Sequence, residues 1–232
     1  KIKNKTNKDY INFFPAVDYY VYQKSGNTTE FDTKNIFFGK PIESTVENKH
    51  LKDLPNYLPN LITKETISVF HKVTTTKEGY KPVFKRGLAL RDDKETGLCN
   101  VEWSGETIDW IYGGNKNGFS KQRHGIIAKS RKTKGDLSGS DTPLINKVMI
   151  NFSGGIEHYN VEYKSKKDKV GVLDKTMYFE VNDDEEGKHI ENFFKSDIVQ
   201  FMFLMTQYTV GAIPQNEPDV ANSISIPPTG ID

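Results

Sequence analysis

The residues best suited to chemistry lie in one basic stretch. Between Trp110 and Gly135 the sequence contains no Asp or Glu. It carries instead seven Lys or Arg residues and one His: Lys116, Lys121, Arg123, His124, Lys129, Arg131, Lys132 and Lys134. Cations at this density neutralise phosphates, and the Asn, Gln and Ser residues among them can bond phosphate oxygens or base edges. The stretch predicts contact with double-stranded DNA. The alternative is a solvated loop balanced by nearby acids: Glu102, Glu106, Asp136 and Asp141.

A second pattern is compatible with metal-dependent cleavage of DNA. Glu162, Tyr163 and Lys164 match the Glu-x-Lys half of the PD-(D/E)xK nuclease site, where carboxylates hold the metal and the lysine orients the attacking water. Asp141 is the upstream carboxylate, but Ser rather than Pro precedes it. Because three-residue matches are frequent by chance, the nuclease is an alternative hypothesis. The nearby lysines 164, 166, 167 and 169 are typical of a polar hairpin tip.

The other reactive residue types favour packing over catalysis. The histidines 50, 71, 124, 158 and 189 lack the short spacings of a zinc site. Neither a Gly-x-Ser-x-Gly elbow nor a Gly-Lys-Ser/Thr loop occurs, and Cys99 lies between Leu98 and Asn100 as a small packed side chain. Trp103 and Trp110 could stack on an unpaired base, although core packing is the default. We expect no catalytic residue, metal or cofactor in this chain.

Composition sets the class of protein. An aromatic content of 12% argues against disorder, even though the mean hydropathy is −0.63. The single cysteine cannot form an internal disulfide, and no apolar run approaches the roughly 20 residues of a membrane-spanning helix. We therefore expect a cytoplasmic protein with no membrane partner. The start at Lys1 lacks both Met and a signal peptide, which suggests a fragment of a longer chain.

The elements that must position these residues are mainly strands. Alternation of apolar and polar residues predicts a strand from Thr66 to Val73, and short strands are expected at 107–112 and 125–129 around a Gly/Asn-rich turn. Further strands are predicted at 31–38, 147–152, 158–163 and 176–181. This pattern predicts an α+β fold with mostly short antiparallel strands. The chain divides into a mainly β region, 1–145, with a basic loop at 110–135, and a region 146–232 of β-hairpins and helices. The two regions are either separate domains or parts of the same domain.

Helices are predicted only near the end of the chain. Asn182 with Glu185 resembles a capping box, and the apolar residues Ile190, Phe193 and Phe194 follow it. Ser196 is expected to cap a second helix, whose buried face would be formed by Ile198, Phe201, Met202 and Met205. Prolines 214, 218, 227 and 228 predict an extended tail, with residues 216–226 following an irregular surface path.

The C-terminal third resembles the target-recognition region of adenine-specific (N6) DNA methyltransferases of restriction-modification systems, phages or large viruses. The likeness lies in the strand and Ser/Gly turn at 147–155, the acidic helix start at 182–186, the helix break at Ser196, and the Ile-Pro stretch at 220–227. The family's Asn/Asp-Pro-Pro-Tyr/Phe tetrapeptide and Gly-rich cofactor loop are absent. The resemblance implies a DNA-recognition module whose catalytic neighbour binds S-adenosylmethionine and methylates adenine.

Three hypotheses follow from the sequence. The first is a DNA-recognition module, with the eight residues of the basic stretch as contacts. The second is a nuclease that uses Asp141, Glu162 and Lys164. The third is a module that binds another protein through its aromatic β surface. The salt dependence of binding distinguishes the first hypothesis from the third. Affinity that rests on phosphate contacts falls steeply with ionic strength, whereas the affinity of an apolar interface does not.

Overall fold

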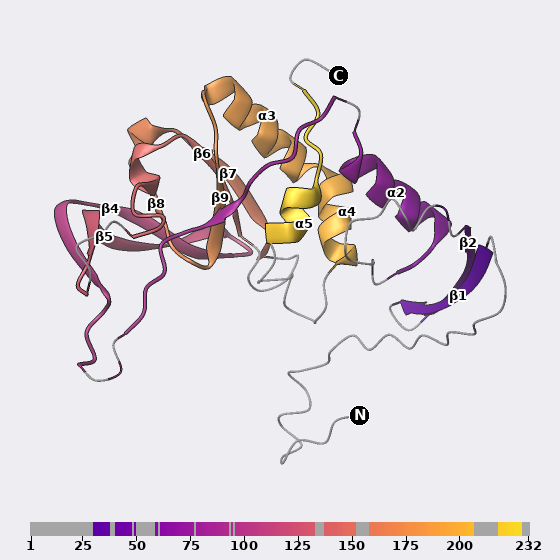
Figure 1. Ribbon diagram of the computed structural model, residues 1–232, viewed down its shortest axis with the longest axis horizontal. Coiled ribbons are helices and arrows are strands. Elements are labelled where there is room, and N and C mark those ends of the chain that lie inside the picture. The colour runs from indigo at the N-terminus through magenta and orange to yellow at the C-terminus, as the bar shows by residue number, and fades with distance from the viewer. Residues whose placement is uncertain are drawn as a thin grey trace, which may run out of the picture.

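The computed structural model describes residues 30–37, 40–47, 49, 59, 61–76, 78–92, 94, 96–132, 137–151, 158–206 and 218–228. These residues form an α+β fold in which all strand pairs except β4 with β8 are antiparallel, so the predicted fold class is confirmed. Figure 1 shows the β4–β5 hairpin at one end of the molecule and the separate β1–β2 hairpin at the other. Those strands are β1 Glu30–Phe37, β2 Lys40–Glu47, β4 Val101–Asn115 and β5 Gly118–Ser130.

The central sheet has the order β3-β9-β6-β7. Its strands are β3 Lys85–Arg86, β6 Lys147–Asn151, β7 Asn160–Lys164 and β9 Thr176–Glu180, so three predicted strands are confirmed within two residues at each end. Val148 and Ile150 face the helices, whereas Met149 packs with Ile111 and Val172 of the second sheet. That sheet has the order β5-β4-β8, with β8 at Gly171–Val172. The central sheet is therefore covered on both faces.

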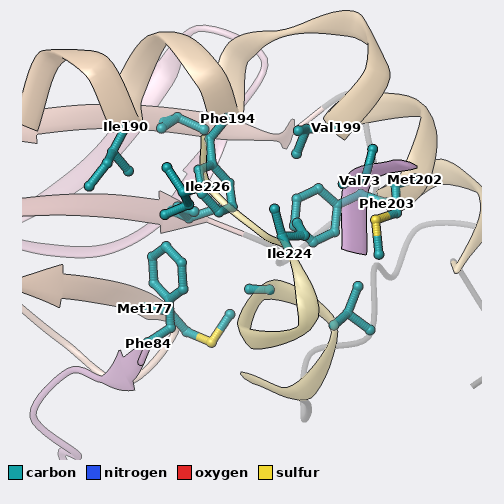
Figure 2. Close-up of a cluster of buried hydrophobic side chains, with 14 of the residues drawn as sticks. Val73, Phe84, Met177, Ile190, Phe194, Val199, Met202, Phe203, Ile224 and Ile226 are labelled. Atoms are coloured by element: carbon teal, nitrogen blue, oxygen red, sulfur yellow. The ribbon is translucent and has the colours of Figure 1, made fainter. Parts of the chain in front are cut away.

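In the part of the chain that the structure describes, four helices pack on the outer face of the central sheet and beside it (Figure 1). They are α2 Lys64–Thr74, α3 Asp184–Lys195, α4 Asp197–Met205 and α5 Pro218–Ser223. Figure 2 shows how side chains from these helices meet Met177 of β9 and Phe84 in one apolar cluster. The cluster extends from Leu61 to Ile226, so both regions distinguished in the sequence contribute to a single core.

The predicted strand at Thr66–Val73 is wrong, because this segment is part of α2. Thr63 begins the helix: its side chain accepts a hydrogen bond of 3.2 Å from the amide of Thr66. Ile67, Phe70 and Val73 then recur on one helical face and are buried. The β-branched residues mimicked a strand, and the tertiary contacts of the apolar face with α4 decided the outcome.

The prediction of an irregular surface path for residues 216–226 is also wrong over its described part. The helix α5 begins at Pro218, a position where proline lacks no needed hydrogen bond. Val220, Ala221, Ile224 and Ile226 are at most 2% exposed. The backbone of Ile226 exchanges two hydrogen bonds with Tyr80, at 2.8 and 3.0 Å. Residues 212–217 and 229–232 of the predicted tail lie outside the described residues.

The predicted helix starts are shifted. Asp183, not Asn182, caps α3 by accepting a 2.9 Å hydrogen bond from the Glu186 amide, while Glu186 accepts the amide of Asn182. Ser196 stands before α4 as expected, but its hydroxyl donates to the Phe193 carbonyl instead of capping α4.

The buried face of α4 differs from the predicted one. It consists of Val199, Met202, Phe203 and Met205, whereas Ile198 is 39% exposed and Phe201 is only partly buried. The break at Ser196 sets the rotation of the new helix. The apolar pattern alone leaves that rotation open, because seven of the nine residues of this helix are apolar and they lie on every side of it.

Lys147 is a fully buried lysine at the start of β6, between Lys164 of β7 and Glu180 of β9. Its ammonium donates to the Ile145 carbonyl at 3.2 Å. Burial lowers the pKa of Lys147 to about 8, and the nearby Asp168 carboxylate only partly opposes this shift. Below about pH 8, Lys147 is protonated in both the folded and the unfolded chain. The cost of burying its charge therefore lowers the free energy of unfolding in that pH range.

We expect Lys147→Met to raise the free energy of unfolding at pH 7 by about 1–3 kcal/mol, because it removes a desolvated charge of similar length. Between pH 8 and 10.5, Lys147 holds its proton more tightly in the unfolded chain than in the folded one. The free energy of unfolding of the unchanged protein therefore rises with pH in this range, relative to that of the variant. Urea unfolding at pH 7 and 10 measures both effects. A variant that is less stable at pH 7 would show that the buried ammonium stabilises the fold.

Candidate nucleic-acid interface

The basic stretch forms a long hairpin rather than the predicted loop. β4 and β5 pair in antiparallel fashion from Val101 with Ser130 to Asn115 with Gly118. The Asn115 side chain accepts the Asn117 amide at 2.8 Å, and Gly118 adopts a φ of 119°, which only glycine adopts readily. The predicted turn is thus confirmed, but the strands around it are continuous and much longer than expected. Two register shifts on β4 bend the ribbon.

The inner face of the hairpin is aromatic. Trp110 is fully buried and donates from Nε1 to the Gly125 carbonyl at 3.2 Å. A Cβ atom at Gly171 would lie 2.2 Å from the Trp110 ring, so β8 can approach only because it has glycine there. Trp103 lies edge-on to Trp110 and stacks on His124 with 4.4 Å between ring centroids. The default prediction of core packing is confirmed for Trp110.

The outer face of β5 carries three cations and one apolar residue at odd-numbered positions. Lys121, Arg123 and Lys129 are exposed, and Ile127 among them is 45% exposed. Side chains alternate between the two faces of a strand, so these four residues lie on the same side. The even-numbered residues Gln122, His124, Ile126 and Ala128 belong to the opposite side. From the sequence alone these residues are predicted to form a basic loop. The strand pairing is needed to show which of them share a face.

Two of the cations are held by a carboxylate that the sequence interpretation missed. Asp109 lies opposite Arg123 in the register. Its oxygens are 3.3 Å from Lys121 Nζ and 3.9 Å from Arg123 Nε. Arg123 also donates to the Thr107 carbonyl at 3.2 Å. Asp109 stands one residue before the acid-free stretch, and only the cross-strand register brings it into the middle of the basic face.

The other predicted contacts lie toward the ends of the ribbon. Lys116 is exposed at the turn, and Lys129, Arg131 and Lys132 are exposed at the far end. Within the described residues, Lys116, Lys129 and Arg131 make no ion pair with a carboxylate. Lys134 lies outside the described residues, as does Asp136. The structure thus places seven of the eight predicted residues on one hairpin.

His124 differs in character from its basic neighbours. Its ring stacks on Trp103, and Nε2 lies 3.3 Å from the Gln122 Oε1 atom. Burial lowers the pKa of His124 below its usual value, because the imidazolium loses hydration in this position. The imidazole is therefore largely neutral at pH 7, and it supports the Trp103 side of the ribbon rather than adding charge to the outer face.

Two of the three residues of the nuclease hypothesis lie on one strand, and the third, Asp141, lies on another element. Glu162 and Lys164 share one face of β7 and form an ion pair with each other. Asp141 stands before a short 3-10 turn, η1 Thr142–Leu144. Among the described residues, no group of three or more His, Cys, Asp and Glu side chains is arranged to hold a metal ion. The ion pair and the separate position of Asp141 give the hypothesis no added support.

The second lysine cluster forms a capped turn. Ser165 caps the 3-10 turn η3 Lys166–Asp168 by accepting the amide of Lys167, and Asp168 accepts the amide of Ser165 at 2.8 Å. Lys169 bonds Glu106 of β4 at 2.6 Å. Lys169 therefore ties the turn to β4, but the turn is not the predicted hairpin tip, because it connects β7 to β8 in a different sheet.

The fold and this hairpin define an α+β domain that presents a basic two-stranded ribbon. No protein-family model matches the sequence, and no curated protein is detectably similar to it. Within the part of the chain that the structure describes, no helix has the length and apolar character needed to cross a membrane.

Proposed function

We propose that this chain is a DNA-recognition module that contacts a duplex through the outer face of the β4–β5 hairpin. The observation that carries the proposal is the presence of three exposed cations on one face of β5, Lys121, Arg123 and Lys129, continued by Lys116 at the turn and Arg131 beyond the strand. Lys116, Lys129 and Arg131 have no carboxylate partner among the described residues, so their charges are available to phosphate.

The dimensions of the ribbon suit a duplex. Strands rise roughly 3.3 Å per residue, so the cations from Lys121 to Lys129 extend over about 26 Å. Phosphates along one strand of B-DNA are spaced 3.4 Å along the axis, and the ribbon therefore covers about eight base pairs. A two-stranded ribbon also fits the major groove, where exposed Ile127 could contact a thymine methyl group.

Asp109 gives the interface a charge pattern. Its carboxylate repels phosphate and offsets one of the two positive charges of Lys121 and Arg123. The two ends of the ribbon, with Lys116 at one and Lys129 and Arg131 at the other, are therefore the stronger phosphate anchors. A charge pattern of this kind fixes the position of the hairpin on the duplex and leaves the middle to contact bases.

The proposed partner of this module is the catalytic domain of an adenine-specific DNA methyltransferase. The resemblance of the C-terminal third supports this assignment, and the chain lacks the family's adenine-holding tetrapeptide and Gly-rich cofactor loop. S-adenosylmethionine would accordingly bind the catalytic partner. In this division of labour, the hairpin selects the site and the partner transfers the methyl group.

Fluorescence anisotropy of a labelled random-sequence duplex pool at 50 and 200 mM salt tests DNA binding. Three to five phosphate contacts predict a slope of log K against log salt of about −3 to −5. The dissociation constant would thus rise by roughly 60-fold to 1,000-fold between the two concentrations. Absence of binding at 50 mM, or binding that is indifferent to salt, would contradict the proposal and favour an interface for another protein. A calorimetric titration with S-adenosylmethionine checks the division of labour, since the chain alone should not bind it.

A further inference from the structure

A cleft of about 380 Å³ lies where the hairpin turn meets the central sheet. The start of β5 forms one wall with Phe119. The edge strand β7 supplies Asn160 and Glu162, and Tyr159 stands just before it. The helices α3 and α4 supply Glu191 and Gln200. The hairpin tip is fixed over this cleft because the Asn160 amide donates to the Asn115 carbonyl at 3.0 Å. Lys116, a proposed phosphate anchor, is two residues from the cleft wall at Gly118.

The Asn160 amide of the cleft has used both of its N–H donors, and the Gln200 amide has used one of its two. The Asn160 Nδ2 atom donates to the carbonyls of Asn115 and His158, and the Gln200 Nε2 atom donates to the Lys195 carbonyl at 2.7 Å. Carbonyl partners accept only, so they fix which amide atom is nitrogen and which is oxygen. The Asn160 Oδ1 and Gln200 Oε1 atoms accept no hydrogen bond from any described residue.

Each carboxylate of the cleft forms an ion pair through only one of its two oxygens. Lys164 bonds one oxygen of Glu162, and Lys195 bonds one oxygen of Glu191 at 2.6 Å. The second oxygen of each carboxylate accepts nothing from the residues that the structure describes. The cleft therefore presents acceptors without a net negative charge, next to the aromatic residues Phe119 and Tyr159. Four acceptor oxygens are therefore open beside the remaining N–H groups of Gln200 and Lys195, and a flat, neutral group that donates N–H bonds fits this excess of acceptors.

We propose that this cleft binds an unpaired nucleobase bearing an exocyclic amino group, namely adenine, cytosine or guanine rather than thymine. This inference rests on the proposed DNA contact, which would bring the duplex to the adjacent hairpin. Small-molecule sites measure roughly 300–1,000 Å³, so a cleft of this volume accommodates one nucleoside. Amino groups supply the required donors, and the aromatic side chains supply apolar contact for the base.

The test compares duplexes that carry one extrahelical adenine or one extrahelical thymine, measured by anisotropy against a fully paired duplex. The adenine duplex should bind about tenfold tighter than the thymine duplex, the effect of one or two added hydrogen bonds. Gln200→Leu should abolish this difference and leave affinity for the paired duplex unchanged. Gln200→Glu retains an acceptor and should keep the difference. Gln122→Leu, on the hairpin but outside the cleft, is the matched control.

Equal affinities for the two extrahelical bases, or a difference that persists in Gln200→Leu, would overturn the assignment of the cleft. Titration with free adenosine and thymidine, followed by NMR of the cleft residues, separates this outcome from failure of the DNA proposal. Adenosine binding without duplex binding would uphold the cleft and reject the hairpin interface. Binding of arginine amide instead of adenosine would overturn the nucleobase and assign the cleft to a protein side chain.

Discussion

Replacing Lys116, Lys129 and Arg131 together by Ala is expected to weaken binding to duplex DNA by roughly 10² to 10³-fold at 0.1 M salt. Each phosphate contact contributes about 0.9 to the slope of log K against log salt, so three contacts lower the magnitude of the slope by about 2.7. The effect is large because these cations have no carboxylate partner among the described residues. Anisotropy titrations over a series of salt concentrations give both numbers.

The matched control is a triple change of Lys85, Lys175 and Lys188 to Ala. These exposed lysines lie on β3, on the turn before β9 and on α3, away from the hairpin, and their loss changes the net charge by the same amount. Equal loss of affinity in both triple variants would mean that net charge alone drives binding. Lys121→Ala should have a smaller effect than Lys129→Ala, because Asp109 already holds Lys121.

Phe194→Ala is expected to lower the free energy of unfolding by about 3–5 kcal/mol, the usual range for a buried phenylalanine. Phe194 is fully buried, and its ring lies 5.3 Å from that of Phe84 and 6.5 Å from that of Phe203. Figure 2 shows it at the centre of the contact between the helices and the sheet. Urea unfolding followed by tryptophan fluorescence measures the loss.

Phe193→Ala provides the comparison within the same helix turn. Phe193 is only partly buried at the edge of the cluster, so its removal should lower the unfolding free energy by roughly 1–2 kcal/mol. If both changes destabilised the protein equally, the helix would be rotated relative to the described position. The two variants therefore test the orientation of α3 as well as its contribution to stability.

The sequence predicts strands well where β-branched and aromatic residues form short runs between turns. Residues 147–151, 160–164 and 176–180 are such runs, and each is a strand. Prediction from the sequence fails where the local secondary-structure preference and the tertiary packing disagree. The segment 66–73 alternates like a strand, yet its Ile67, Phe70 and Val73 form a helical face that packs against α4. The prolines around α5 likewise suggested a surface path, although one of them begins the helix.

The site is predictable in part for a similar reason. The density of cations between Lys116 and Lys132 is visible in the sequence, and the structure places them on one hairpin. The neutralising role of Asp109 depends on cross-strand register, which no local pattern specifies. The cleft is invisible to sequence reading, because its lining comes from segments about 40 residues apart that only the fold brings together.

The antiparallel bridge between Tyr80 and Ile226 bears on how the protein folds during its synthesis. The apolar face of α2 leaves the ribosome about 150 residues before Ile224 and Ile226, which share its core. At roughly 5–20 residues per second, that face waits about 8–30 s for its last partners. Long-range contacts of this kind slow folding. Nascent chains of this protein would therefore depend on chaperones during that interval more than a protein whose helices pack with near neighbours.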